Sequence, residues 1–443
     1  MRFKIKVLAL IGFLFVYSLC FSQDKFRIAQ NQNSHSASFK LIHNIIILPI
    51  EVNGSELNFL LDTGVANSIM FNLSAEDSLR LRDREKIRLR GLGEGGYIDA
   101  IRSSNNTFKF GKVVNTNHMI YLIPGNEFEL SSHMGIDING IIGGDLFRDF
   151  IVDINYTTKR IKFNKPESYF YKKCKKCQTF DLEFYKEKPY LNIIVQSDNE
   201  QPIPVKLLID SGGGDTLWLF DKSSDDIEIP ERNFEDYLGR GLSGNIYGKR
   251  SKIGKIEIGD FIFNDANVAY PDSSSIEKAY QHAERNGSLA SEILKRFRLI
   301  IDYPNKKITF AKKSKYFNDA FLYNMSGIEL SYSGSMLVKE RDNSVPLGVF
   351  NDAESTTIEL VYKYVYAFKQ SFEIVHLRKD SPAHKAGLQI KDVILQINGK
   401  PAYDHKLEEI IHILSTKPNK LIKLIIDRDG EVLSYSFRLE NVL

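Results

Sequence analysis

Two aspartates stand where a buried strand is expected to end. Asp62 lies in "LLDTG" and Asp210 in "LIDSG", each directly after apolar residues. A carboxylate against a core strand is costly unless it is hydrogen-bonded, paired or protonated. Two such carboxylates that meet can share one proton, so that one takes a proton from a water molecule while the other hydrogen-bonds a carbonyl oxygen. This chemistry is hydrolysis without a covalent intermediate and without a metal.

The two aspartates belong to a repeated sequence. "LLDTGVANSIMF" (60–71) is similar to "LIDSGGGDTLWLF" (208–220), and the aspartates are offset by 210 − 62 = 148 residues. "NGIIGGDLFRDFIVDINYTTKRIKF" from Asn139 aligns without a gap with "NGSLASEILKRFRLIIDYPNKKITF" from Asn286. "RGLGEGGY" also matches "RGLSGNIY" between them. Three matched segments in the same order predict two copies of one unit.

The copies are expected at residues 40–165, the first repeat, and 188–312, the second repeat, with a connector at 166–187. Each copy is rich in β-branched and aromatic runs broken by Gly and Asn, which predicts short strands and hairpins. A short helix is expected at "GDLFRDF" and at "SEILKRF", where apolar residues recur three or four apart. The equivalent aspartates of two such copies can meet across a pseudo-two-fold axis.

Residues 40–312 resemble an aspartic peptidase of the retropepsin–pepsin class. The resemblance rests on Asp-Thr-Gly-x-x-Asn-Ser from Asp62 and Asp-Ser-Gly-x-x-Asp-Thr from Asp210. It implies a mainly β fold with two acid-protease-like β-barrel lobes in a pseudo-two-fold arrangement. The apolar–apolar–Gly element of that class fits Ile141-Ile142-Gly143, but Ser288-Leu289-Ala290 has Ala in place of Gly.

The predicted site residues follow from these motifs. Asp62 and Asp210 are expected to be catalytic, and their support is expected from hydroxyls that brace the two loops and from glycines that permit a tight turn. The supporting residues are Thr63, Gly64, Ser211 and Gly212. The resemblance also implies two flaps over a bound peptide, at 91–97 and 241–248. Their substrate-binding candidates are Gly93, Gly95, Gly96, Tyr97, Gly241, Gly244 and Tyr247.

After a linker at 313–326, residues 327–443 resemble a PDZ domain of the bacterial kind that is often attached to proteases. "DSPAHKAGL" predicts a one-turn helix, "DVILQINGK" a strand that ends in an Asn-Gly turn, and "HKLEEIIHIL" an amphipathic helix. PDZ domains bind an extended peptide as an added strand. The usual Gly-φ-Gly-φ carboxylate loop is not clear, so a peptide ligand is expected but capture of its terminal carboxylate is left open.

The N-terminus predicts export. Residues 1–22 combine Arg2, Lys4 and Lys6 with an apolar stretch and small residues suited to cleavage, the layout of a signal peptide. A membrane anchor is the alternative, so the location is expected to be periplasmic or extracellular, with membrane association left open. An exported chain makes Cys174 and Cys177 candidates for a local disulfide.

Composition narrows the function. Lys+Arg 59 against Asp+Glu 56 leaves a net charge of +3 with no basic stripe, which argues against nucleic-acid binding. No metalloprotease, serine-hydrolase or nucleotide-loop motif was found, and no cofactor is expected. The sequence therefore predicts an exported, monomeric aspartic endopeptidase whose PDZ domain recruits or regulates peptide or protein substrates. The alternative is an inactive peptide-binding scaffold on a degenerate peptidase fold.

Overall fold

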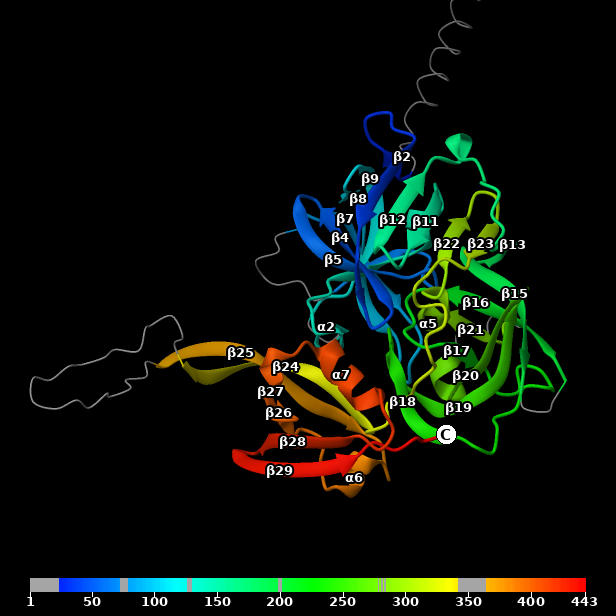
Figure 1. Ribbon diagram of the computed structural model, residues 1–443. Coiled ribbons are helices and arrows are strands. Elements are labelled where there is room, and N and C mark those ends of the chain that lie inside the picture. The colour runs from blue at the N-terminus through cyan, green and yellow to red at the C-terminus, as the bar shows by residue number, and fades with distance from the viewer. Residues whose placement is uncertain are drawn as a thin grey trace, which may run out of the picture. The chain divides into compact units, whose positions relative to one another are not determined.

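The computed structural model describes residues 24–71, 79–125, 130–197, 201–277, 279, 282, 284–341 and 364–443 (Figure 1). The predicted signal peptide lies outside these residues. The chain divides into a first unit, up to residue 130 and at 137–321, and a second unit, at 131–136 and 322–442. Within the described ranges, no helix is both long and apolar enough to span a bilayer.

The first unit begins with twelve strands and a short helix in the region up to residue 164. They are β1 (Arg27–Ile28), β2 (Ser34–Ser38), β3 (Lys40–Ile42), β4 (Ile45–Val52), β5 (Ser55–Leu61), β6 (Ser68–Met70), β7 (Arg82–Leu89), β8 (Ile98–Phe110), β9 (Val113–Leu122), β10 (Gly140–Ile142), α3 (Gly144–Phe147), β11 (Ile151–Asn155) and β12 (Arg160–Asn164). The helix α2 (Leu130–Met134) lies at the boundary between the units.

The elements that follow complete the first unit. They are η1 (Pro166–Ser168), β13 (Cys177–Asp181), β14 (Glu183–Tyr185), β15 (Lys188–Gln196), β16 (Ile203–Asp210), β17 (Leu217–Leu219), β18 (Phe234–Gly241), β19 (Gly244–Ile258), β20 (Phe261–Pro271), α4 (Ser273–Ile276), β21 (Gly287–Ala290), α5 (Ser291–Leu294), β22 (Arg298–Asp302) and β23 (Lys307–Ala311). The two predicted short helices are present as α3 and α5.

The two repeats have the same strand order. In the first, hydrogen-bonded neighbours follow β9-β6-β10-β5-β4-β8, and β8 also pairs with β9, so the pairing closes on itself. In the second, the order is β20-β17-β21-β16-β15-β19, and β19 pairs with β20. Each ring contains one strand that ends next to a predicted catalytic aspartate, β5 or β16. The two segments that repeat in the sequence thus share one order of paired strands.

A six-stranded sheet joins the repeats in the order β13-β23-β22-β11-β12-β2. Its centre is the antiparallel pair β11–β22, in which Asp153 lies opposite Ile300. The outer strands β2 and β13 come from segments outside the predicted repeats, one before residue 40 and one within the predicted connector. They were not anticipated because each completes a sheet whose other strands are distant in sequence.

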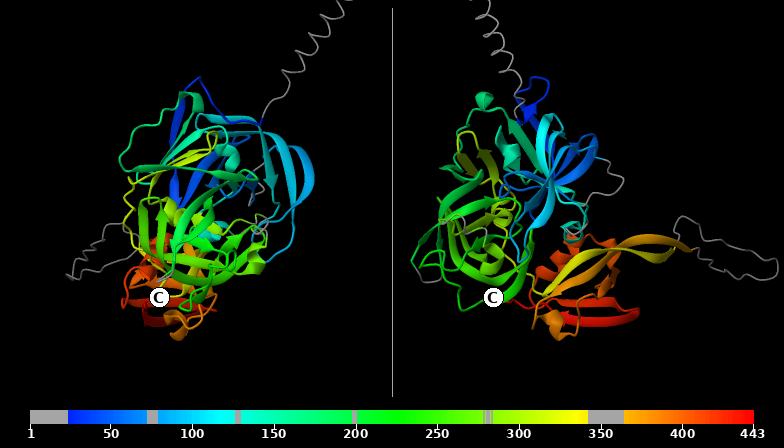
Figure 2. Two further views of the ribbon diagram at one scale, coloured as in Figure 1. Left: turned by 90° about the vertical axis from the view of Figure 1, so that its right-hand side faces the viewer. Right: turned by 180° about the vertical axis from the view of Figure 1, so that it is seen from behind.

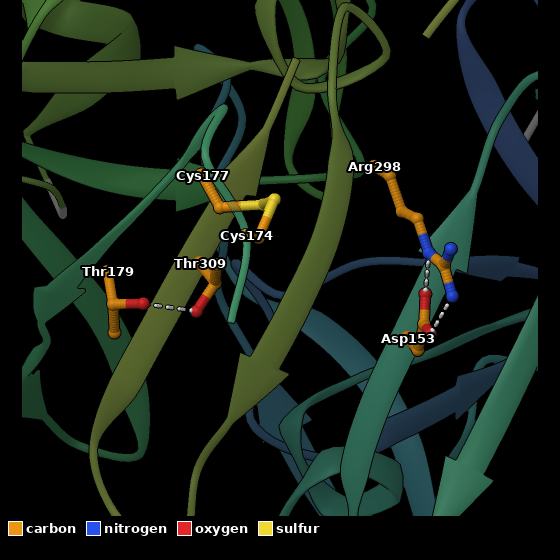
Figure 3. Close-up of a disulfide and its surroundings, with 6 residues drawn as sticks. All are labelled: Asp153, Cys174, Cys177, Thr179, Arg298 and Thr309. Carbon is orange, nitrogen blue, oxygen red and sulfur yellow. Dashed lines mark hydrogen bonds and ion pairs between the residues drawn. A yellow bond between two sulfur atoms is a disulfide. The ribbon is translucent and has the colours of Figure 1, made fainter. Parts of the chain in front are cut away.

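Polar contacts cross or flank this shared sheet (Figure 3). Arg298 on β22 donates to both carboxylate oxygens of Asp153 on β11, at 2.8 and 2.6 Å. Thr179 and Thr309 share a hydroxyl–hydroxyl bond of 2.7 Å between β13 and β23. Cys174 and Cys177 form a disulfide at the start of β13. The disulfide and the threonine pair thus fix β13, the edge strand that lies within the connector.

The apolar core of the first unit is one cluster that runs through both repeats. Alternation in the ring strands produces it: in β16, Val205, Leu207 and Ile209 are buried on one face. The opposite face carries Lys206, Leu208 and Asp210. The same strand thus anchors the core and presents the aspartate on its other face.

The second unit contains a five-strand path with short helices. Its elements are β24 (Ile328–Arg341), β25 (Tyr364–Leu377), α6 (Pro382–Lys385), β26 (Val393–Ile397), β27 (Lys400–Pro401), η3 (Ala402–Asp404), α7 (Leu407–Ser415), β28 (Leu421–Arg428) and β29 (Glu431–Arg438). The sheet order is β24-β25-β26-β28-β29, so β24 lies at an edge. Figure 2 shows the β24–β25 hairpin extending from the rest of this unit.

The predicted elements of this unit are present. Ser381 caps α6, where its hydroxyl accepts the His384 N–H, and the Asn398-Gly399 turn after β26 has both residues at positive φ. Helix α7 buries Leu407, Ile410 and Leu414 in a separate apolar cluster. Residues 342–363, between β24 and β25, lie outside the described residues.

Candidate active site

The two aspartates occupy equivalent positions at the ends of strands β5 and β16. The Asp62 N–H donates to the carbonyl of Ile142 on β10, at 2.9 Å. Asp210 is the last residue of β16 and lies beside Ala290 on β21. Both lie deep in the protein and keep part of their surface exposed.

The hydroxyls of Thr63 and Ser211 connect the two aspartate loops reciprocally. The Thr63 N–H donates to Ser211 Oγ at 3.0 Å, and the Ser211 N–H donates to Thr63 Oγ1 at 3.0 Å. Each hydroxyl then donates to the opposite strand: Thr63 to the Ile209 carbonyl at 2.6 Å, and Ser211 to the Leu61 carbonyl at 2.9 Å. All four bonds are buried, which holds the two loops in one geometry.

The glycines bring the carboxyl groups close together. The Gly64 N–H donates to Asp62 at 2.7 Å, and the Gly212 and Gly213 N–H groups donate to Asp210 at 3.1 and 2.9 Å. A Cβ on Gly212 would lie 2.3 Å from Asp62 Cγ. A Cβ on Gly64 would lie 3.0 Å from Asp62 Oδ1 and 3.5 Å from Asp210 Cγ. Each glycine therefore faces the carboxyl group of the other repeat.

The surroundings of Asp62 and Asp210 raise the pKa of both carboxyl groups and so favour a protonated form of the pair. Burial, together with the charge of Asp210, raises the pKa of Asp62 to about 7, although the Gly64 N–H opposes the shift. Burial also raises the pKa of Asp210, and Arg285 and the Gly213 N–H oppose that shift. Two buried carboxyl groups that repel each other retain a proton near neutral pH.

Ala290 departs from the motif of the first repeat, and its N–H donates to the Thr216 carbonyl at 3.1 Å, whereas the Gly143 N–H donates to Asp145 Oδ1 at 3.2 Å. In the first repeat a Cβ on Gly143 would lie 2.0 Å from the carbonyl oxygen of Val65. In the second repeat the corresponding pair is Ala290 and Gly213, and a Cβ on Gly213 would lie 3.4 Å from Ala290 Cβ. In the first repeat the glycine of this pair is Gly143, whereas in the second repeat it is Gly213. The glycine at 213 leaves room for the Ala290 side chain.

The two predicted flaps meet at their tips. The Gly95 N–H donates to the Ser243 carbonyl at 2.6 Å, and the Ser243 N–H donates to the Leu92 carbonyl at 2.8 Å. Ser243 Oγ accepts the Gly91 N–H at 3.0 Å and donates to the Gly96 carbonyl at 3.1 Å. Ser243 was not among the predicted residues, although it lies at the centre of this contact.

The other flap candidates surround the same contact. Gly93 and Gly244 have positive φ values of 119° and 123°, and a Cβ on Gly241 would lie 2.2 Å from the carbonyl oxygen of Leu92. Tyr97 is 62% exposed and lies under Arg88 and Arg90, whereas Tyr247 packs against Tyr237 within the β18–β19 hairpin. The tips therefore need glycine for the close approach of the two backbones. The two tyrosines differ, because Tyr97 contacts arginines and Tyr247 contacts a tyrosine of its own hairpin.

Two cations beside the aspartates were also missed by sequence reasoning. Lys188 is largely buried, and its charge acts on both Asp62 and Asp210. The Arg285 side chain is 5% exposed, and its charge acts on Asp210. Neither belongs to a recognisable motif: Arg285 differs from Ile138 in the ungapped alignment, whereas the counterpart of Lys188 is defined only by the strand register.

A buried Ser–His–Asp cluster lies within the first repeat. His118 Nε2 is 2.9 Å from Ser68 Oγ and 3.2 Å from Asp145, and its Nδ1 is 3.3 Å from Asp24. Burial lowers the pKa of His118, but hydrogen bonds that its ring donates to these carboxylates outweigh burial and raise the pKa to about 9. Ser68 and His118 are completely buried, and Ser68 Oγ donates to Asp145 at 2.8 Å. This cluster ties the segment before β1 to the first repeat.

Comparisons with known families agree with the two resemblances. Residues 48–146 match the family model of aspartyl proteases, and residues 373–428 match that of a PDZ domain. The prediction of an aspartyl protease region followed by a PDZ domain is confirmed. The fold is mainly β and includes a PDZ domain.

Curated relatives share only short segments with this chain. A "Probable CtpA-like serine protease" of Staphylococcus haemolyticus (strain JCSC1435) is 38% identical over 53 residues, 12% of this chain and 11% of that protein. One of Staphylococcus aureus (strain COL) with the same name is 28% identical over 106 residues, 24% of this chain and 20% of that protein. The chain thus spans a fifth or less of these relatives, whose names describe serine proteases.

Proposed function

We propose that this chain is an exported aspartic endopeptidase in which Asp62 and Asp210 activate one water molecule. The observation that carries the proposal is the reciprocal bracing of the two aspartate loops by Thr63 and Ser211. It sets each carboxyl group against the glycine of the other repeat. Structural carboxylates that only cap loops need no such partner from an equivalent loop.

The architecture supports two β-barrel lobes related by a pseudo-two-fold axis. Each repeat closes a ring of six paired strands in the same order. The two rings meet through β11 and β22, where Asp153 lies opposite Ile300. These positions are equivalent in the repeated sequence, since 300 − 153 = 147. An antiparallel pair centred on equivalent residues is what a two-fold axis between the lobes produces.

The reaction follows from the protonation state of the pair. With one proton shared, the ionised carboxylate takes a proton from water as the water oxygen attacks the peptide carbonyl carbon. The protonated carboxyl group hydrogen-bonds the carbonyl oxygen, on which negative charge develops. Proton transfer to the amide nitrogen then breaks the C–N bond, and the pair is again left with one proton.

The flaps and the PDZ domain are assigned to substrate binding. Flap tips held by hydrogen bonds between Gly95, Leu92 and Ser243 would exclude water from the reacting bond when closed over a peptide. In the PDZ domain, β24 lies at the sheet edge and contacts α7, which suits addition of a peptide strand.

The loop before β24 favours an internal peptide segment over a terminal carboxylate. Asn324 Oδ1 accepts the N–H groups of Ser326 and Gly327 at 3.0 and 3.2 Å. Ser326 Oγ accepts the Ile328 N–H at 3.1 Å. Because these side chains already satisfy the backbone donors, the loop offers fewer N–H groups to an incoming carboxylate.

The names of the relatives raise a serine mechanism as the rival. Within the described residues, Ser68 and His118 are positioned like a nucleophile and base, but both are completely buried. Ser68 Oγ is also engaged by Asp145. The cluster therefore lacks substrate access, which favours the aspartic reaction.

The test is peptide cleavage by the purified mature protein. Asp62→Asn and Asp210→Asn should each abolish cleavage of a mixed peptide library, because an amide cannot share the proton. Ser68→Ala should retain cleavage if it folds, and a statine-type inhibitor should block the wild type. Equal cleavage by the wild type and both asparagine variants would refute the aspartic assignment. A folded wild type that cleaves no peptide would favour the inactive scaffold.

A further inference from the structure

Lys188 and Arg285 place two positive charges beside the carboxyl pair, both on the second repeat. In the β15–β16 pair, Tyr190 lies opposite Leu208, and the same register continued by two residues puts Lys188 opposite Asp210. Opposed residues of an antiparallel pair point to the same face of the sheet. Lys188 and Tyr190 therefore share the face that carries Asp210.

Arg285 approaches this face from the other neighbour of β16. Ser288 on β21 lies beside Leu208, and Arg285 Nη2 donates to Ser288 Oγ at 2.7 Å. Arg285 Nε donates to the Gly287 carbonyl at 3.0 Å, and the guanidinium lies 5.0 Å from the centre of the Phe220 ring. The Tyr190 hydroxyl also interacts electrostatically with Arg285. The guanidinium is thus held rigidly by neutral groups.

The first repeat has apolar residues at the equivalent positions. Ile47 lies opposite Leu60, and the same continuation puts Ile45 opposite Asp62. Ile138 precedes Asn139 as Arg285 precedes Asn286, and each asparagine side chain accepts a backbone N–H from the aspartate strand, at 3.0 and 2.8 Å. The two sides of the carboxyl pair therefore differ: Ile45 and Ile138 on one, Lys188 and Arg285 on the other.

The local charges do not balance. A carboxyl pair that shares one proton carries one negative charge, whereas Lys188 and Arg285 carry two positive charges. The nearby acidic residues Glu183 and Glu284 are engaged by Lys206, at the exposed end of the same strand face. Buried charge is costly unless it is compensated. One further carboxylate would neutralise this side of the site.

We propose that Lys188 and Arg285 form a subsite for an acidic side chain of the substrate, next to the scissile bond on the side of the second repeat. The first repeat takes an apolar side chain on the other side of the bond. This substrate class rests on the proposed peptidase function. Lys188 keeps part of its surface exposed and can reach the carboxylate, whereas the buried Arg285 guanidinium, held by Gly287 and Ser288, adds a second positive charge to the subsite.

A different role for the two cations makes a different prediction. If they serve only to hold the carboxyl pair ionised, their removal changes the pH dependence of cleavage equally for all peptides. A subsite for an acidic side chain instead makes cleavage depend on the charge of one substrate residue.

The primary test needs only the wild type. Matched peptides that differ by Glu or Gln, at one position at a time around an established cleavage site, are compared by kcat/KM. We expect Glu to be preferred at one position adjacent to the bond by about tenfold or more, the contribution of one hydrogen bond to a charged group. The preference should weaken with increasing salt.

Variants then locate the effect. Arg285→Met and Lys188→Met should each reduce the ratio of kcat/KM for Glu and Gln peptides towards one, measured on protein whose folding is checked by its thermal transition. Lys313→Met is the control, because it removes an exposed positive charge just after the second repeat and should leave the ratio unchanged. If one of the two variants only partly reduces the Glu/Gln ratio of kcat/KM, the other cation contributes more to the preference for Glu.

The failures are distinguishable. Cleavage of Glu and Gln peptides at equal rates at every position by the wild type would overturn the subsite and leave the peptidase proposal intact. A preference for Glu that survives both methionine variants would also overturn it. Absence of cleavage of any peptide, neutral or acidic, would instead refute the proposed function.

Discussion

At the scale of single residues, the run Gly212-Gly213-Gly214 after Asp210 would, from the sequence alone, be interpreted as a sign of a degenerate, inactive aspartate motif. The structure gives two of these glycines separate reasons. Gly212 is in contact with the Asp62 carboxyl group, and Gly213 faces Ala290, where the first repeat pairs Val65 with Gly143. The glycine run is therefore consistent with a site in which the packing differs between the repeats while Thr63 and Ser211 still connect the two aspartate loops.

The raised pKa of Asp62 predicts how stability depends on pH. Because the pKa rises from an ordinary value near 4 to about 7 on folding, the folded protein binds more protons than the unfolded chain between these values. The contribution of Asp62 to the free energy of unfolding is thus full below pH 4 and is lost as pH rises through 7. Asp62→Asn should therefore be more stable than the wild type at pH 8, with a smaller difference at pH 4.

Denaturant unfolding of both proteins at the two pH values measures this difference. Asp225→Asn, which changes an exposed aspartate, should show no such dependence. Wild-type cleavage should also decline above pH 7, where the shared proton is lost. A stability difference that is larger at pH 4 than at pH 8 would contradict the electrostatic account.

At the scale of elements, the flaps are two hairpins with different tips that share one serine. Ser243 is one of two residues between β18 and β19, whereas the first flap is the longer segment between β7 and β8. The side chain and backbone of Ser243 bind four backbone groups of that segment. The contact between the two proposed flaps is thus concentrated on one residue.

Ser243→Ala should loosen this closure. It removes the side-chain bonds to Gly91 and Gly96 but keeps the backbone bonds, so we expect KM to rise by about fivefold, equivalent to roughly 1 kcal/mol for the net loss of a hydrogen bond, with a smaller change in kcat. Steady-state kinetics on one peptide measures both. Ser274→Ala, which changes an exposed residue of α4, is the control. An unchanged KM would show that the flaps do not close through Ser243.

Much of this element pattern could be predicted, because local sequence determines it. The strand Val393–Ile397 and the short helices after Gly143 and Ala290 follow from periodicity and turn residues, whereas the two flaps were implied by the family resemblance. The pairing of β2 with β12 and of β13 with β23 could not, since residues far apart in sequence meet there. For the same reason Lys188 and Arg285 became candidates only once the strand register was known.

At the scale of the whole molecule, the chemistry and the recruitment of substrate are assigned to different units. A chain that ends at Phe321 keeps the residues around the carboxyl pair, and Phe321 itself packs against Phe263 and Arg296. This shortened chain should cleave short peptides nearly as fast as the full chain. Cleavage of long protein substrates should weaken, because the strand-addition contact and its effective concentration are lost.

Both rates are to be measured on the same preparations, with the thermal transition as a check on folding. Loss of short-peptide cleavage in a folded shortened protein would mean that the second unit supports the site directly. Equal cleavage of long substrates would mean that the PDZ domain does not recruit them.

The shared sheet has a consequence for how activity responds to dilution. Its central strand pair β11–β22 and the ion pair between Arg298 and Asp153 lie within one polypeptide, which also carries both catalytic candidates. The two halves of the site therefore meet as an intramolecular event, at a local concentration set by the chain and not by the sample. A peptidase built this way keeps its turnover per molecule at concentrations where a site assembled from two separate chains would dissociate.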